Sequence, residues 1–183
     1  MNKILEKIDI PKGLIKLLNE NPIPKLEEEI TDFYFIKPER LKDAQEDYRI
    51  DEMTGEDVTG KEKGDWKSEW LVIGVGVADD PLFIDLGEES KEFPIYTAAN
   101  GAGEWLPYKV SNSIPSFVKI LKILNEMVKT QQFDGEEFLD KIDKYTDTLG
   151  VWEEEVEMLD EMLLDGVNEI IYSNEDWRLK IKD

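Results

Sequence analysis

Acidic side chains are the most numerous reactive groups in this sequence, and several of them flank its most apolar segments. The chain has no cysteine and no histidine, which excludes thiolate nucleophiles, Ser-His and Cys-His dyads and imidazole metal ligands. Any catalysis would therefore rest on carboxylates, lysine, tyrosine or a bound cofactor. Four carboxylates are candidates for an acid/base pair or a hard-metal site: Asp79, Asp80, Asp85 and Glu104.

Two segments resemble ligand-binding motifs but depart from them at the positions that matter. The segment "GVGVAD" (74–79) begins like a dinucleotide-binding G-x-G-x-x-G loop, but Asp79 replaces the third glycine and Pro81 opens a strand. No helix N-terminus is then expected to hold a pyrophosphate. The segment "DEMTGEDVTGKE" (51–62) places Met53 where a calcium loop needs a ligand. We therefore expect no cofactor and no metal.

Turn chemistry offers a simpler role for two of these carboxylates. Asp80 directly precedes Pro81, a position where aspartate accepts hydrogen bonds from nearby backbone in a turn. Asp85 follows "LFI" in period two, so it either faces solvent or binds a neighbouring backbone amide. A hydrolase that pairs Asp85 with Glu104 or Asp79 stays open as one function hypothesis. It requires two buried carboxylates that converge in a deep pocket.

The balance of charge favours a basic protein as the partner. The 43 acidic and 22 basic residues give a formal net charge of −21, which opposes nucleic acid and anionic membrane surfaces. Opposite charges steer association, so a basic protein is the natural complement. Between residues 151 and 176 there are ten acidic residues and no lysine or arginine. No apolar run has the length of a membrane span and the first residues lack a signal-peptide pattern, so we expect a cytoplasmic protein.

Hydrophobic periodicity predicts short helices near the N-terminus and strands in the middle of the chain. Residues 1–20 fit one or two short helices. Pro38 opens a helix that extends through Tyr48, with Leu41 and Ala44 facing inward. A mobile loop is expected over residues 51–65, which include three glycines. Four strands are expected, over residues 33–36, 69–78, 81–86 and 93–98.

Three helices with apolar residues at spacings of three and four are expected after the strands. The first starts near Pro115, and the second starts with an Asp-x-x-Glu capping pattern at Asp134 and ends at Gly150. The third carries the acidic residues and buries one apolar stripe that starts at Trp152. The segment "WRLKIK" (177–182) alternates strictly, which predicts an edge strand whose lysines oppose pairing with a second copy.

The grouping of strands apart from helices predicts an α+β fold. We expect a single domain over residues 1–183, with a core at about 30–128 and an acidic helical extension at about 130–183. The glycines Gly101 and Gly103 permit a tight turn after the last central strand, and Trp105 is expected to cover that turn.

The order of four segments resembles the SUKH superfamily, which includes bacterial immunity proteins and a fungal cell-wall-synthesis regulator. The segments are "WKSEWLVIG" (66–74), "DDPLFIDL" (79–86), "FPIYTAANGAGEW" (93–105) and "SNSIPSFVKIL" (111–121). In the order given, the first two are similar to a family strand that ends in Ile-Gly and to a strand that ends in Asp. The third is similar to a strand with Pro-Val/Ile-Tyr that is followed by a Gly-rich turn and a Trp. The fourth is similar to a helix that opens with Ser-x-x-x-Phe. The resemblance covers about residues 30–128. The signature of the family's first helix is not seen in residues 1–30. The segment after about residue 130 extends beyond the usual length of the family's domain.

The resemblance implies a mixed or antiparallel central sheet flanked by helices, no catalysis, and the binding of a protein partner. In bacterial members an immunity protein, or antitoxin, neutralises a cognate toxin by direct binding; in the fungal relative the module is a regulatory scaffold. For a tight inhibitor we expect a few aromatic anchors inside an acidic rim. The candidate partner-binding residues are Asp79, Asp80, Asp85, Tyr96, Glu104, Trp105, Glu153, Glu154 and Glu157.

Overall fold

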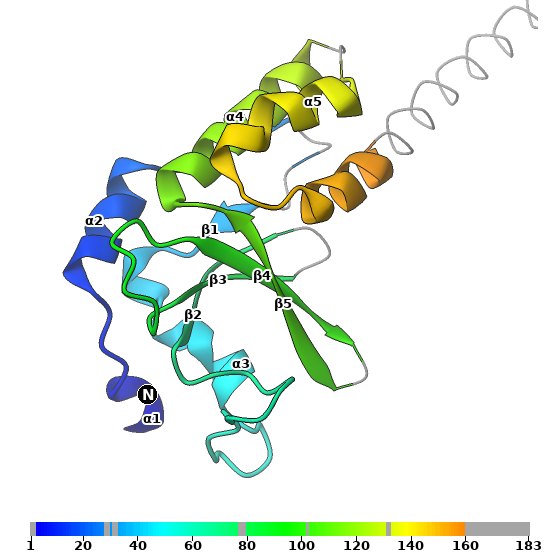
Figure 1. Cartoon of the computed structure of the whole chain (residues 1–183). Coiled ribbons are helices and arrows are strands. Elements are labelled where there is room, and N and C mark those ends of the chain that lie inside the picture. The colour runs from blue at the N-terminus through cyan, green and yellow to red at the C-terminus, as the bar shows by residue number, and fades with distance from the viewer. Residues whose placement is uncertain are drawn as a thin grey trace, which may run out of the picture.

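The computed structural model describes residues 3–27, 30, 33–76, 80–101, 103–130 and 133–159. Its centre is a five-stranded sheet in which each strand pairs antiparallel with the next one along the chain, in the order β1-β2-β3-β4-β5. Longer helices lie on one side of this sheet, and a short helix with extended loops lies on the other (Figure 1). The predicted α+β fold is confirmed, and every strand pair is antiparallel.

Four of the five strands fall on segments that the sequence predicts as strands. The strands are β1 (Tyr34–Phe35), β2 (Trp70–Val75), β3 (Pro81–Asp85), β4 (Ile95–Gly101) and β5 (Glu104–Ser111). β5 is not predicted, because Pro107 interrupts its apolar pattern. β4 and β5 form a long hairpin whose turn includes Gly103, and the φ of Gly103 is +84°, a conformation that favours glycine.

β2 is buried on both faces, as its continuous apolar run predicts. Leu71 and Ile73 belong to the larger core cluster, on the side of the long helices. Trp70 and Val72 belong to a second, aromatic cluster on the opposite face. Successive side chains of a strand point to opposite faces, so one apolar segment serves two separate cores.

The α-helices begin and end close to the predicted positions, with two exceptions given below. They are α1 (Lys3–Glu6), α2 (Lys12–Glu20), α3 (Glu46–Arg49), α4 (Ile114–Lys129) and α5 (Gly135–Ile142), and a further helix covers residues 150–159. The capping pattern at Asp134 is confirmed, since its Oδ1 accepts a hydrogen bond of 2.9 Å from the backbone N–H of Glu137. Ser113 caps α4 in the same way, accepting a hydrogen bond from the N–H of Ser116.

The core on the helical side is built around aromatic rings contributed by distant parts of the chain. Phe117 of α4 is fully buried and lies within 6.3 Å of Trp152, measured between ring centroids. Phe33 and Phe138 also pack against Trp152. The helix over 150–159 is therefore part of the main core, and its predicted apolar stripe is confirmed as far as Leu159.

The segment from Pro38 to Arg49 departs from the single helix that the sequence predicts. It forms 3-10 turns over Pro38–Arg40 and Asp43–Gln45, followed by the single turn of α3. Leu41 is buried as predicted, but Ala44 is only half-buried and Gln45 is fully buried instead. The amide of Gln45 donates to the carbonyl of Val72 and accepts from its N–H, both at 2.9 Å. This bonding to β2 outweighs the local helical pattern.

The helix that the sequence predicts to end at Gly150 ends earlier. α5 finishes at Ile142, a 3-10 turn covers Asp143–Tyr145, and residue 150 is the first of the next helix. Residues 146–149 run instead along β5, to which they are hydrogen-bonded. Gly150 is therefore a helix start and not a helix stop.

The predicted edge strand at 177–182 and the acidic helix beyond residue 159 lie outside the described residues. The predicted loop over 51–65 contains turns and one isolated β-bridge, and Asp51 accepts hydrogen bonds there from the N–H groups of Met53 and Thr54. Within the part of the chain that the structure describes, no helix has the length and apolar content that crossing a membrane requires.

Candidate partner-binding groove

The helix over 150–159 is fixed against the edge strand β5 by one buried tryptophan. Trp152 is almost fully buried, and its Nε1 donates a hydrogen bond of 2.8 Å to the carbonyl oxygen of Val110 in β5. The bond satisfies a polar group that burial would otherwise leave unpaired. The helix is thereby held along the same face of the sheet as α4 (Figure 1).

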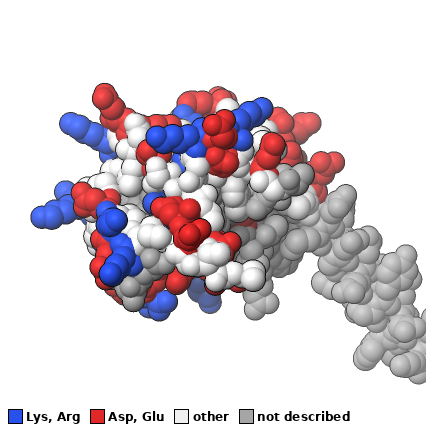
Figure 2. Space-filling view, turned by 90° about the horizontal axis from the view of Figure 1, so that it is seen from below, with Lys and Arg blue, Asp and Glu red and all other residues white. Residues whose placement is uncertain are grey.

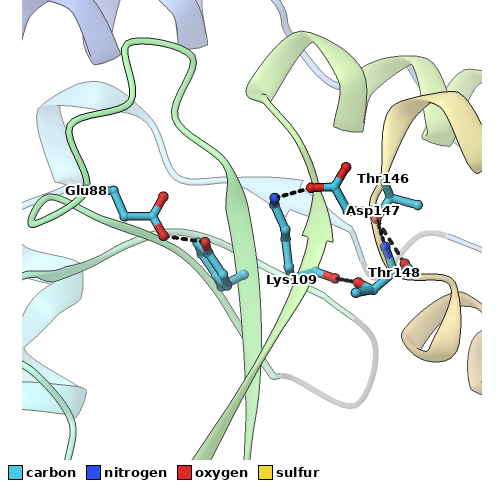
Figure 3. A network of polar contacts seen from close by, with 6 residues as sticks. Glu88, Lys109, Thr146, Asp147 and Thr148 are labelled. Carbon is cyan, nitrogen blue, oxygen red and sulfur yellow. Dashed lines mark hydrogen bonds and ion pairs between the residues drawn. The ribbon is translucent and has the colours of Figure 1, made fainter.

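The segment before this helix is held to β5 by polar contacts (Figure 3). The ammonium group of Lys109 lies 2.6 Å from the carboxylate of Asp147, and the Thr148 hydroxyl donates to the carbonyl oxygen of Lys109 at 2.8 Å. Asn112 N–H donates to the carbonyl of Tyr145 at 2.9 Å. The Lys109 hydrogen bond is the main cause of the lowered pKa of the Asp147 carboxyl, so this ion pair is charged at neutral pH.

A groove of about 560 Å³ lies between β5 and the start of this helix. We call it the β5 groove; its lining residues are Pro107, Tyr108, Lys109, Thr148, Gly150, Val151, Glu153, Glu154 and Glu157. A smaller cavity of about 150 Å³ adjoins it, since Tyr108, Val151 and Glu154 line both.

Large apolar side chains are exposed at this groove. The side chain of Tyr108 is 50% exposed, Met158 in the adjoining cavity is 45% exposed, and Leu106 is 40% exposed. Leu106 lies two residues before Tyr108 on β5, so both side chains share one face of the sheet. Exposed apolar residues that gather beside a groove are typical of surfaces that bind another protein.

The groove is acidic as well as apolar. Glu153, Glu154 and Glu157 line it, and Lys109, its one basic lining residue among the described ones, is already paired with Asp147. On the face seen from below, Lys and Arg side chains are interspersed with Asp and Glu (Figure 2). Acidic and exposed apolar side chains thus lie together at this groove.

Asp80 is brought to the same place from a distant part of the sequence. It precedes β3 and lines the small cavity together with Glu154. Partial burial raises the pKa of its carboxyl above the ordinary aspartate value. Of the nine residues predicted to bind the partner, the structure therefore gathers four here: Asp80, Glu153, Glu154 and Glu157. Asp79 lies outside the described residues.

Asp85 and Glu104 do not line this groove, and they lie toward opposite ends of the sheet. Asp85 ends β3, where its Oδ1 accepts a hydrogen bond of 2.7 Å from the N–H of Gly87, the turn role considered for it above. Glu104 starts β5 at the opposite end of the sheet, opposite Gly101. The Asp85–Glu104 pair considered for a hydrolase is therefore not assembled, and the alternative pair of Asp85 with Asp79 includes a residue outside the described ones.

Tyr96 and Trp105 belong to the aromatic cluster on the other face of the sheet. Tyr96 stacks on Phe83 at 5.7 Å between ring centroids, and its hydroxyl donates to the carboxylate of Glu88 (Figure 3). Trp105 packs edge-on against the buried Trp66 at 5.0 Å. Both are only partly exposed, and their ring contacts stabilise this second core.

β5 is an edge strand that is poorly suited to accepting an additional strand. The N–H of Trp105 donates to the carbonyl of Gly64 at 2.8 Å, Pro107 has no N–H, and the carbonyl of Lys109 accepts from Thr148. A strand that is added to a sheet needs a continuous row of free backbone groups. A partner at this edge would therefore contact side chains.

Two exposed apolar residues beside the groove are not placed at a site by the sequence analysis: Leu106, which adjoins the groove residue Pro107, and Met158 of the small cavity. A signal for Leu106 exists, since Leu106, Tyr108 and Val110 alternate in period two. Met158 stands one residue before the buried Leu159 and has no such signal, because its exposure depends on where the helix meets β5.

Among the described residues, no group of three or more acidic side chains is arranged to hold a metal ion. Comparison of the chain with models of known protein families, with curated proteins and with solved structures finds no match. The resemblance to the SUKH superfamily therefore stays a prediction from the sequence.

Proposed function

We propose that this protein is a non-enzymatic binding module of the immunity type, which neutralises a cognate basic toxin by holding it at the β5 groove. The observation that carries the proposal is the gathering of exposed apolar groups, above all Tyr108 and Met158, beside five carboxylates, four from the helix over 150–159 and one just before β3. The order of motifs that resembles the SUKH superfamily supports the immunity role.

The physical basis is the combination of two kinds of contact. Burial of the exposed parts of Leu106, Tyr108 and Met158 would provide affinity, because removing apolar surface from water contributes about 25 cal/mol per Å². The carboxylates would select a cationic surface and raise the rate of encounter, because opposite potentials steer two proteins together. The net charge of −21 acts in the same direction over longer distances.

The proposal requires a toxin gene adjacent to this protein's own gene, and the test is binding to the product of that gene. The purified chain should form a stable complex with that toxin and abolish its activity at equimolar concentration. Reversing three groove charges, in the variant Glu153→Lys, Glu154→Lys and Glu157→Lys, should weaken the complex on the order of 100-fold, since like charges then face each other.

A matched control separates the groove from the overall charge. Glu52→Lys, Glu89→Lys and Asp140→Lys change the net charge by the same amount at exposed positions away from the groove. This control should keep most of the affinity. Equal weakening by both triple variants would show that only net charge matters, and a neighbouring toxin that neither binds nor is inhibited would refute the immunity role. Tight binding of a protein that is not a toxin would point to the regulatory-scaffold alternative.

A further inference from the structure

The small cavity beside the β5 groove has the size of one side chain. Its volume is about 150 Å³, and an apolar protein cavity of roughly that size holds a molecule such as benzene. Drug-sized ligands need more space, about 300–1,000 Å³. The ligand expected here is therefore a single group that projects from a larger partner.

The walls of the cavity are apolar over most of their area. The fully buried rings of Phe117 and Trp152 line it, as do the buried Leu82 and Val110. These residues come from α4, the helix over 150–159, β3 and β5, so the cavity is a gap between the sheet and the helices that cover it. An aliphatic chain placed here would lose its contact with water and gain packing contacts.

Carboxylates line the same cavity. Asp80 and Glu154 contribute to its lining, as does Glu155. No hydrogen bond or ion pair joins the Asp80 carboxylate to another described residue, and partial burial raises its pKa. A partly desolvated carboxylate with no partner among the described residues favours a cation, because a neutral apolar ligand would remove its remaining water without compensation.

We propose that this cavity receives the side chain of one lysine or arginine of the protein partner, with its methylene groups against Phe117 and Leu82 and its cationic head at Asp80 and Glu154. Arginine gains a further contact at Tyr108, whose half-exposed ring also lines the cavity and can stack on a guanidinium group. That the side chain belongs to a protein partner rests on the proposed function. That the cavity prefers a cationic group rests only on its own lining residues.

Small alkyl cations test the cavity without any partner. The full chain would be titrated with n-butylguanidinium and n-butylammonium, and with n-pentanol and butyrate as neutral and anionic probes of similar length. Chemical shifts of the Met158 methyl group and of the Trp152 indole N–H report on the cavity in NMR spectra. We expect saturable shifts for both cations with dissociation constants of about 1–10 mM, as small fragments give, and binding at least tenfold weaker for pentanol and butyrate.

Matched variants locate the binding to the named carboxylates. Asp80→Asn should weaken butylguanidinium binding at least fivefold, while Asp140→Asn, which removes the same charge at an exposed position of α5, should leave it unchanged. Glu154→Gln provides the comparison if Asp80→Asn does not fold, as judged by its thermal unfolding. Tighter binding of pentanol than of the cations, or shifts that map outside the cavity, would overturn the proposal.

The two proposals can fail separately. If the neighbouring toxin binds at the β5 groove but no cation enters the cavity, the cationic receptor is wrong and the immunity role stands. If the cations bind with the expected specificity but the toxin is not bound, the immunity role is wrong and the receptor for a cationic group stands.

Discussion

Gln45 shows how one polar side chain can determine the path of a segment. It is fully buried, and its amide donates to Leu41 and Val72 carbonyls and accepts from the Val72 N–H. These bonds link the 3-10 turns to β2 in the interior, where an unpaired backbone group is costly. The buried Arg49 acts similarly, donating to the carbonyls of Ser68 and Trp70.

Replacing this amide by an apolar group of similar size should destabilise the fold. Gln45→Leu leaves the N–H and the carbonyl of Val72 without their partner, so we expect the free energy of unfolding to fall by about 2–4 kcal/mol. Chemical denaturation measures this change. Gln45→Glu keeps the acceptor but buries a charge, so it should destabilise the protein at least as much as Gln45→Leu. If Gln45→Leu lowered the free energy of unfolding by less than about 0.5 kcal/mol, the bonding seen at β2 would be contradicted.

Tyr96 links a single ionisation to stability at high pH. Burial of its hydroxyl, together with the hydrogen bond to Glu88, raises its pKa above the ordinary value of 10.0. The folded protein then keeps the phenol proton at pH values where the unfolded chain has lost it. The stability from this group is therefore fully present below about pH 10 and decreases as the pH rises further.

The comparison of the wild-type chain with Tyr96→Phe isolates this effect. Between about pH 9.5 and 11.5 the free energy of unfolding of the wild type should decline more steeply than that of Tyr96→Phe, since only the wild type carries this ionisation. Contributions from all other groups are common to both proteins and cancel. Parallel pH profiles would show that Tyr96 titrates alike in the folded and unfolded states.

At the scale of elements, the helix over 150–159 combines local charge repulsion with a buried tertiary anchor. Its described acidic residues, including Glu153, Glu154 and Glu157, repel one another along one helix. Against this repulsion stand the burial of Trp152, Val156 and Leu159 and the bond from Trp152 to β5. The position of the groove therefore depends on this packing.

Trp152→Phe should loosen this helix more than the rest of the molecule. The substitution removes the donor to the Val110 carbonyl and leaves a void beside Phe117 and Phe138, so a loss of about 1–3 kcal/mol in the free energy of unfolding is expected. Hydrogen exchange should show the largest loss of protection at residues 150–159. A uniform loss across α4 and the sheet would instead mean that the helix unfolds only with the whole protein.

For the whole molecule, the net charge of −21 is a source of self-repulsion. The described part of the chain contains four ion pairs, and each involves at least one side chain that is well exposed. Exposed pairs contribute little, about 0–1 kcal/mol each. Repulsion among the excess carboxylates is thus not balanced by local pairing.

Moderate salt should therefore stabilise the protein. Raising NaCl from about 10 to 300 mM shortens the screening length from about 30 Å to below 10 Å, and we expect the midpoint of thermal unfolding to rise by about 2–4 °C. The gain should level off near 300 mM. A steady rise up to about 1 M would indicate exclusion of salt from the surface, and a fall would contradict net repulsion.

Features that depend on neighbouring residues could be read from the sequence. The apolar stripes of α4 and of the helix over 150–159, the cap at Asp134 and the doubly buried β2 all follow from spacing within one segment. Such patterns determine which face of an element is buried, whatever the element packs against. The α+β class followed in turn from the order of these elements.

Features that depend on contacts between distant segments needed the three-dimensional fold. The inward turn of Gln45, the start of a helix at Gly150, and the placing of Asp80 beside Glu154 all result from packing across the sheet. A local pattern carries no information on which remote backbone group will need a partner, or on which two charged residues will line one cavity. Long-range strand pairing and the burial of Trp152 against β5 determine which groups meet. They thereby also determine the position of the acidic groove.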